Sequence, residues 1–451
     1  MKKNIDILHG SLPRGIVRFV LPLAATGILQ QLFNAADIAV VGRFVGKEAM
    51  AAVGSNGALI NLLINLMMGI AMGTNIVVAT AIGRGDEKTV HKAVHTSIII
   101  SVLGGVFFAI VNEIFAIPIL DLIAVPPEVI GMASVYLRIY FAGLPLIVLY
   151  NFEAAVFRSC GDTRTPLVAL TASGVLNVVL NVFFVVKLNM GVSGVAIATV
   201  IANGFSAAAL FIALVRTDKV IRFRKSDLRI DPAILQQILR IGVPTGIQGM
   251  VFSISNIILQ AAINSLGTVC IAASAAALNI EILNFFMFNA FGQACSTFVS
   301  QNNGAGNIAR CHRTLGWSFI LGFLFTGTLA GLGFVFGKDL LALFNKDPQV
   351  IATGYIRVQI LCATFPLSLM NELSSGYLRG YGVTHLPALC SVFGICGLRI
   401  LWVSTVFRHW RTFTSLILVY PVTIGLTGAS IAVAAYIYER RRGSIGPSRE
   451  Q

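Results

Sequence analysis

LGFLFTGTLAGLGFVF, residues 321–336, contains no charged side chain. As a helix rising 1.5 Å per residue, about 20 residues of this kind cross the ~30 Å hydrocarbon core of a bilayer. Comparable apolar runs with few charges occur at residues 16–41 and 415–438. The chain is 56% hydrophobic and only 12% charged, whereas a soluble domain carries roughly 25% charged residues. The sequence therefore predicts an all-α integral membrane protein.

Apolar runs recur along the whole chain, so no large soluble domain fits between them. We predict twelve transmembrane helices, at residues 15–41, 49–80, 92–116, 131–154, 166–186, 192–215, 240–265, 270–301, 313–336, 352–375, 387–407 and 413–438.

The chain also repeats itself at a spacing near 221 residues. Arg158-x-x-Gly161-x-x-x-x-Pro166 returns as Arg379-x-x-Gly382-x-x-x-x-Pro387. Further pairs at nearly this spacing are Gly83-Arg-Gly-Asp86 with Gly304-Ala-Gly-Asn307, Asn34 with Asn256, and Tyr136-Leu-Arg138 with Tyr355-Ile-Arg357. Each repeat holds an even number of spans, so both halves enter the membrane in the same direction. The halves are therefore predicted to be homologous six-helix bundles, related by a pseudo-two-fold axis along the membrane normal.

The predicted domains are an N-terminal bundle at residues 1–215, a cytoplasmic linker at 216–235, and a C-terminal bundle with a basic tail at 236–451. The linker is polar and basic. The Gly-x-Gly pairs lack a preceding strand and a P-loop lysine, so we interpret them as tight turns between helices. Glycines at helical spacing predict close helix packing, as in Gly69-x-x-x-Gly73 and Gly327-x-x-x-Gly331.

The net charge of +14 follows the membrane topology. With a cytoplasmic N-terminus, 23 Lys and Arg residues fall on the cytoplasmic side. Seven fall on the opposite side, and these are Arg43, Lys47, Lys187, Lys338, Lys346, Arg408 and Arg411. This bias predicts a multi-pass protein of the plasma or inner membrane with both termini cytoplasmic. Anionic lipid accounts for the basic charge, and no nucleic-acid partner is expected.

Cysteine and histidine give weak signals. The seven cysteines include no CxxC pair, and reduced thiols are expected. His91 and His95 are four residues apart, which suits either a metal pair or two polar residues entering the third span. We favour the second interpretation and expect no metal cofactor.

Asp37 is the clearest polar residue within a predicted span. A charge at mid-membrane costs at least about 2.5 kcal/mol, so it calls for a reason. Gln30, Asn34 and Asp37 recur at intervals of four and three residues and share one helix face. This stripe is predicted to face a cavity or another helix. The alternative is that Asp37 is simply hydrated near the outer interface.

Three further polar residues suit an ion site. Asn177 and Asn181 lie one turn apart in the fifth span, and Thr199 lies in the sixth. Carboxylate, amide and hydroxyl oxygens are ligands that Na⁺ would need. A single carboxylate could instead carry a proton, with the amides bonding whichever form is present. Taken singly, each of the three also suits helix packing.

Other acids leave alternatives open. Glu281 in the eighth span suits either contact with substrate or a polar link between helices. Glu372 and Glu153 lie toward the inner ends of their spans and Glu113 toward an outer end. We interpret Glu153 and Glu113 as interfacial, and whether Glu281, Glu372 or Glu153 takes part in transport is left open.

Several segments resemble the multidrug and toxin extrusion (MATE) transporters. They are residues 21–86, Arg158-Ser-Cys-Gly-Asp-Thr-Arg-Thr-Pro166, Gln301-Asn-Asn-Gly-Ala-Gly-Asn307 and Tyr420-Pro421. The resemblance covers nearly the whole chain and points to the prokaryotic branch related to DNA-damage-inducible members. It implies two bundles arranged as a V around a central cleft. It also implies efflux of organic cations or other toxins, driven by H⁺ or Na⁺.

The resemblance places Asp37 at the position of a coupling aspartate and matches Asn177 and Thr199 to the same site. Residue 181 departs from the pattern, because well-studied members with this site carry a second aspartate there. This puts a two-carboxylate Na⁺ site in doubt and leaves a one-carboxylate proton site intact. A tryptophan that often follows the Tyr-Pro motif is also missing here.

We therefore predict a monomeric antiporter that alternates between outward-open and inward-open states, with H⁺ favoured over Na⁺. Small, cationic or amphipathic substrates are expected, with Gln30, Asn34, Asn151 and Glu281 as predicted binding residues. One alternative is a flippase for lipid-linked saccharides, which would favour several arginines in the cleft. Away from the span ends, only Arg138, Arg357 and Arg399 lie within spans. A membrane enzyme is disfavoured, because no metal motif or activated nucleophile is present.

Overall fold

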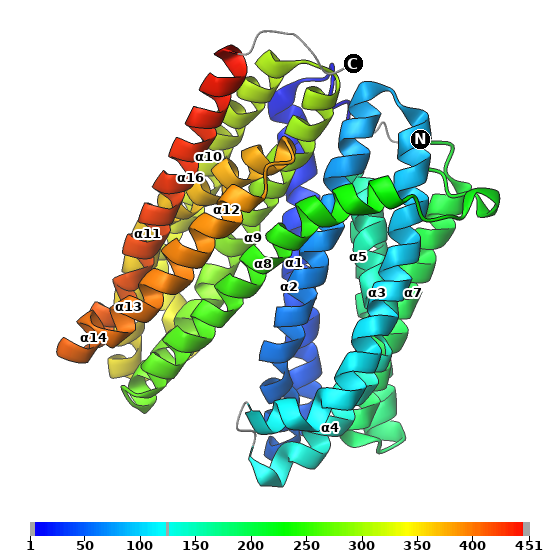
Figure 1. The fold of residues 1–451 in the computed structure, drawn as a ribbon. Helices are drawn as coiled ribbons and strands as arrows, with labels where there is room; N and C mark the ends of the chain where they lie inside the picture. Colours follow the sequence, from blue (N-terminus) through cyan, green and yellow to red (C-terminus); the bar gives the residue numbers. More distant parts are fainter. Residues whose placement is uncertain (1–4, 123–125, 445–451) are drawn as a thin grey trace. The chain divides into compact units, whose positions relative to one another are not determined.

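The fold is built of helices, and the computed structural model describes residues 5–122 and 126–444 (Figure 1). No β-strand occurs in these two ranges. Within these ranges, eleven helical segments are long and apolar enough to cross a membrane. A twelfth span is a helix pair, α4 (Pro127–Ala142) and α5 (Leu144–Ser159), which is bent by 48°. The prediction of twelve membrane helices is thereby confirmed.

The contacts between Cα atoms divide the chain into two units. Of the described residues, unit 1 comprises residue 5 and those in 22–246, and unit 2 comprises those in 6–21 and 247–444. Two long helices contribute to both units, namely α1 (Leu12–Phe44) and α8 (Pro232–Asn264). The other helices of unit 1 are α2 (Lys47–Arg84), α3 (Glu87–Leu122), α4, α5, α6 (Arg164–Val182), η1 (Phe183–Lys187), α7 (Gly191–Arg216) and η2 (Lys225–Asp227).

Unit 2 is built around α11 (Pro348–Gly380), which packs against α9, α10 and α16. Its helices besides the shared ones are α9 (Thr268–Gly304), α10 (Ile308–Ala342), α11, α12 (His385–Ser391), η3 (Val392–Gly397), α13 (Leu398–Ser404), α14 (Val406–His409), α15 (Phe413–Ile417) and α16 (Val419–Ser444). The pieces from α12 to α14 form one membrane span, and α15 with α16 form the last.

This division differs from the predicted domain bounds at both shared helices. Residues 6–21 group with unit 2, where Phe19 meets Phe298 edge-on at 5.7 Å. The linker and residues 236–246 group with unit 1. The difference arises because the predicted bounds follow the repeat in the sequence, whereas the units follow packing.

The sequence repeat is also present in the backbone. Six of the seven described glycines with positive φ form pairs separated by 221 residues, and these pairs are Gly46 with Gly267, Gly85 with Gly306, and Gly161 with Gly382. Each lies at a turn or helix end, where the left-handed region favours glycine. The Gly-x-Gly segments accordingly form the α2–α3 and α9–α10 turns, as predicted.

Close glycine packing holds α2 against the first part of α8. A Cβ atom on Gly73 would lie 2.3 Å from the carbonyl oxygen of Ile238, and one on Gly69 would lie 2.1 Å from the nitrogen of Gly246. The prediction for Gly69 and Gly73 is therefore confirmed. The same prediction for Gly327 and Gly331 is wrong. Gly331 has nothing within 4 Å of its Cβ position, and Gly327 meets only its own helix at 4.0 Å.

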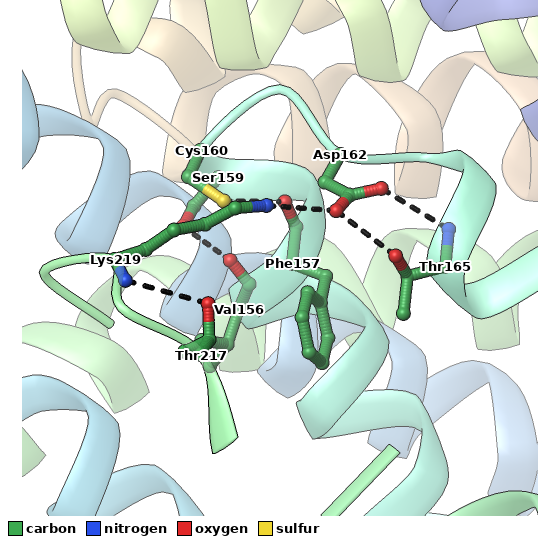
Figure 2. Close-up of polar contacts among 8 residues, drawn as sticks. All are labelled: Val156, Phe157, Ser159, Cys160, Asp162, Thr165, Thr217 and Lys219. Carbon is green, nitrogen blue, oxygen red and sulfur yellow. Dashed lines mark hydrogen bonds and ion pairs between the residues drawn. The ribbon is translucent and has the colours of Figure 1, made fainter. Parts of the chain in front are cut away.

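The linker is fastened to unit 1 by hydrogen bonds and ion pairs. Figure 2 shows Lys219 reaching the turn between α5 and α6, where its Nζ lies 2.8 Å from Asp162 Oδ2. Asp162 also accepts from the backbone N–H of Thr165 at 3.1 Å and from its hydroxyl at 2.9 Å. Burial alone would raise the pKa of Asp162, but the bonds from Lys219 and Thr165 outweigh it and lower that pKa.

His95 holds the next part of the linker. Its ring stacks on Phe223 at 4.8 Å between centroids, and its Nε2 contacts the Arg224 backbone. Its Nδ1 lies 2.6 Å from the carbonyl of His91. Among the described residues, no group of three or more His, Cys, Asp or Glu could hold a metal. His95 thus serves to dock the linker.

Candidate functional site

Four polar side chains from three helices of unit 1 form one hydrogen-bonded cluster around Asp37. Asp37 comes from α1, Asn177 and Asn181 from α6, and Thr199 from α7. Asn181 Nδ2 donates to Asp37 Oδ1 at 2.5 Å and to Asn177 Oδ1 at 3.2 Å. Thr199 Oγ1 lies 3.1 Å from Asp37 Oδ2 and 3.4 Å from Asn177 Nδ2. All four residues are buried.

A glycine lets α1 approach α6 beside this cluster. Gly174 lies one turn before Asn177, and a Cβ there would lie 1.8 Å from the ring of Phe33. Phe33 lies one turn before Asp37 on α1. The missing side chain at Gly174 therefore leaves room for this ring. It lets α1 lie close to α6, where Asp37 meets the two asparagines.

The hydrogen bonds of Thr199 suit both protonation states of Asp37. A hydroxyl has one hydrogen, yet Thr199 Oγ1 lies near two acceptors, Asp37 Oδ2 and the Val195 carbonyl at 2.9 Å. When Asp37 is ionised, the hydroxyl can donate to the carboxylate. When Asp37 is protonated, it can donate to Thr199, which then donates to Val195. The cluster therefore satisfies the carboxyl group either with or without a proton.

One hydrogen-bond acceptor in the cluster receives no hydrogen bond. Asn181 Oδ1 is buried and has no hydrogen-bond partner. Together with oxygens of Asp37, Asn177 and Thr199, it makes a donor set that a monovalent cation could use. In this arrangement, however, the NH₂ group of Asn181 faces Asp37. The donor set therefore fits a proton directly, and Na⁺ only after the amide of Asn181 turns.

The predicted substrate residues of unit 1 lie outside this network of bonds. Asn34 is exposed and Gln30 is half-buried on the same helix as Asp37. Asn151 is buried in α5 and donates to the carbonyl of Ile147 in its own helix, at 2.8 Å. Gln30 and Asn34 are thus available to a ligand, whereas the amide NH₂ of Asn151 is already engaged.

Glu281 belongs to unit 2 and is paired. Arg357 of α11 donates to both of its oxygens, from Nε at 2.8 Å and from a terminal nitrogen at 3.0 Å. A two-point bond of this kind is among the strongest between side chains. Of the two alternatives for Glu281, this geometry is that of the polar link, here joining α9 to α11.

The remaining acids differ in burial and in whether they are paired with an arginine. Glu153 was expected at an interface, but the side chain is fully buried in unit 1, so that expectation is wrong. Neither of its carboxyl oxygens has a hydrogen-bond partner. Glu372 bonds Arg379, and Glu113 lies 3.4 Å from Arg138 at an exposed position. Glu153 gave no signal in the sequence, because its burial depends on packing between helices.

These features define a class of protein. It is a multi-pass helical membrane protein with an internal repeat and a buried carboxylate held in a polar cluster of its first unit. Comparison with protein families narrows the class. The MatE family model matches residues 22–183 and 244–403, one segment in each repeat. The chain therefore belongs to the MATE family of multidrug efflux transporters.

Relatives match over nearly the full length. The chain is 28% identical to the probable multidrug resistance protein YoeA of Bacillus subtilis over 404 residues, covering 88% of this chain and 87% of YoeA. It is 26% identical to the probable multidrug resistance protein NorM of Thermotoga maritima over 429 residues, covering 94% and 89%. A crystal structure of MATE in complex with MaL6 superposes with a TM-score of 0.91 at 21% identity, covering 98% and 100%.

Proposed function

We propose that this protein exports small molecules by antiport with H⁺, and that Asp37 is the residue that couples the two movements. The observation that carries the proposal is the buried carboxyl group of Asp37, which is bonded by Asn181 and Thr199. A buried ionisable group in a membrane helix is costly, and such groups mark proton and ion pathways. Membership of a multidrug efflux family supports the transport part of the proposal.

The coupling follows from the two bonding patterns of Thr199. Asp37 takes up a proton when the cluster is open to the outside and releases it when open to the inside. The change alters which of Asp37 and Thr199 donates, and so alters how α1 is held to α7. Substrate moves in the opposite direction as the protein alternates between outward-open and inward-open states.

H⁺ is favoured over Na⁺ because Asp37 is the one carboxylate in its cluster. Asn177 and Asn181 are neutral, so they add no second negative charge to offset the dehydration of Na⁺. The N–H group that Asn181 points at Asp37 would also repel a cation at that place.

The proposed substrates are cationic or amphipathic small molecules. Relatives are named as multidrug resistance proteins, which fits small substrates of varied structure. Gln30 and Asn34 lie on the same face of α1 as Asp37. Protonation of Asp37 would therefore change how tightly a ligand binds beside them. A monomer suffices for this scheme, with both termini in the cytoplasm.

The test is transport of a fluorescent cation in proteoliposomes, with pH and Na⁺ gradients imposed separately. A pH gradient should drive efflux in the unmodified protein. Asp37→Asn should reduce gradient-driven efflux to the level of empty liposomes, because the amide cannot exchange a proton. Glu113→Gln is the matched control, because it removes an exposed carboxylate of α3 outside the cluster, and it should leave coupling to pH intact.

Two results would contradict the proposal. One is full transport driven by Na⁺ alone, with no response to pH. The other is normal efflux by Asp37→Asn, which would turn attention to the buried acids outside this cluster. Elution as a single species by size exclusion must accompany each variant.

A further inference from the structure

Arg399 is a fully buried cation in unit 2 that has almost no polar partner. It lies at the start of α13, directly after the π-helical turn η3, and its side chain has 0% exposure. One terminal nitrogen donates to Asn256 Oδ1 of α8 at 2.9 Å. The guanidinium otherwise faces aromatic rings, 4.9 Å from the centroid of Tyr420 and 5.3 Å from that of Phe252.

Two nitrogens of Arg399, Nε and the second terminal nitrogen, are buried and have no hydrogen-bond acceptor. Arg399 forms no ion pair with any residue in the described ranges. Arg357, which also lies over the Tyr420 ring, is by contrast paired with the carboxylate of Glu281. The group is therefore positive overall, with donors left unused, and a buried unpaired charge of this kind is destabilising.

The position of Arg399 in the repeat adds an independent observation. Asp37, Asn177 and Thr199 come from the first, fifth and sixth spans of the first half. Asn256, Arg399 and Tyr420 come from the first, fifth and sixth spans of the second half. Tyr420 lies 221 residues after Thr199, which is the repeat spacing. The same three spans of each half thus form a buried polar group, with an acid on the first span in one half and a base on the fifth span in the other.

We propose that Arg399 is the recognition point of a binding site for an anionic group, a carboxylate, phosphate or sulfonate borne by an aromatic molecule. The fork of guanidinium N–H groups matches two oxygens of such a group. Tyr420 and Phe252 supply ring faces beside it. The anion would provide the charge and the acceptors that Arg399 lacks.

This inference rests on the proposed function for transport, but it names a substrate class of opposite charge and a different half of the protein. A polar group that needs a partner discriminates sharply against ligands that lack one. Organic anions should therefore bind through Arg399, while organic cations should not depend on it. Because η3 interrupts regular α-helical bonding just before Arg399, this span has a local irregularity of the kind often found at functional sites.

The experiment compares two xanthene dyes of opposite charge, 5-carboxyfluorescein and rhodamine 6G. Binding to the purified full chain in a neutral detergent is followed by fluorescence anisotropy at pH 7.5. Arg399→Gln should weaken carboxyfluorescein binding at least tenfold and leave rhodamine binding within twofold. Arg399→Lys should weaken carboxyfluorescein at least threefold, since one ammonium replaces the fork. Arg138→Gln, at an exposed arginine of unit 1, should change neither.

The inference is overturned if carboxyfluorescein fails to bind the unmodified protein, or binds Arg399→Gln and Arg399→Lys as tightly. It is also overturned if both dyes are lost in parallel, because Arg399 would then only stabilise unit 2. If Arg399→Gln does not elute as a single species, the comparison of Arg399→Lys with the unmodified protein is the test. No gradient is used, so failure of Asp37 coupling cannot produce these results.

The phosphate chemistry could come from a lipid or from a dissolved molecule, and competition separates them. Phosphatidylglycerol in the micelles and phenyl phosphate in solution are each titrated against bound carboxyfluorescein. Displacement by the lipid alone assigns the site to a headgroup. Displacement by phenyl phosphate assigns it to soluble organic anions. Displacement by neither contradicts an anion site.

Discussion

In the proposed function, Asn181 is the residue that distinguishes coupling to H⁺ from coupling to Na⁺. It bonds Asp37 and Asn177 and keeps its own carbonyl oxygen unpaired. An aspartate at this position would place a second carboxylate in the same buried cluster. Two such groups cannot both ionise without a cation between them, because like charges at close range repel.

Asn181→Asp should therefore make efflux respond to Na⁺, with a Na⁺ gradient increasing the initial rate at least threefold in the proteoliposome assay. Asn203→Asp is the matched control. Asn203 lies one turn beyond Thr199 on α7 and donates to the Thr199 carbonyl, outside the four-residue cluster. An equal Na⁺ response in both variants would mean that added charge, rather than the cluster, attracts the ion.

Asp162 is a residue whose contribution to the stability of the fold should depend on pH. Its pKa is lowered when folded, because bonds from Lys219 and Thr165 outweigh the effect of burial. A lowered pKa stabilises the fold above the ordinary value of 3.8, and this stabilisation is lost as the pH falls through the lowered value.

Asp162→Asn should accordingly cost about 2 kcal/mol at pH 7, the order of a charge-assisted hydrogen bond. The difference in thermal midpoint from the unmodified protein should hold at pH 5 and shrink below about pH 3.8. Asp218→Asn, at an exposed linker acid with no hydrogen bond or ion pair in the described structure, should have no effect at either pH. A difference that grows on acidification would contradict the assignment.

At the scale of helices, glycine decides how closely α2 packs on α8. A Cβ on Gly73 would press on the backbone oxygen of Ile238, and backbone cannot yield as a side chain can. Overpacking of this kind typically costs 1–3 kcal/mol.

Gly73→Ala should therefore lower the thermal midpoint, even though alanine is the better helix former. Gly331→Ala is the control, because nothing lies within 4 Å of the added carbon, and it should be neutral or slightly stabilising. If both substitutions have the same effect, the α2–α8 contact does not limit stability.

At the scale of the whole molecule, the charge distribution predicts topology. Lys225→Cys and Lys346→Cys, each made in a background without the seven native cysteines, provide exposed labels in the linker and the α10–α11 turn. In intact cells an impermeant maleimide should label position 346 and not position 225. Labelling of position 225 from outside would contradict a cytoplasmic linker.

Much of the architecture was predictable because it depends on local pattern. The apolar runs predict the spans, whereas the bend between α4 and α5 and the π-helical turns η1 and η3 add detail that the pattern lacks. Turn glycines such as Gly85 and Gly306 are visible in the sequence because their backbone conformation excludes most other residues. The polar stripe containing Asp37 was visible because helical spacing places its members on one face.

Composition and spacing along the chain were enough to predict a membrane protein, its internal repeat and a carboxylate in the first span. The hydrogen-bond and ion-pair partners of the polar side chains became known only from the packing of the helices. Asn181 meets Asp37 from 144 residues away, and Glu281 meets Arg357 from 76. Arg399, which also lies in an apolar stretch of the sequence, forms no ion pair with any residue that the structure describes. Which charges neutralise one another depends on how helices pack, and packing joins residues whose separation in the chain carries no signal.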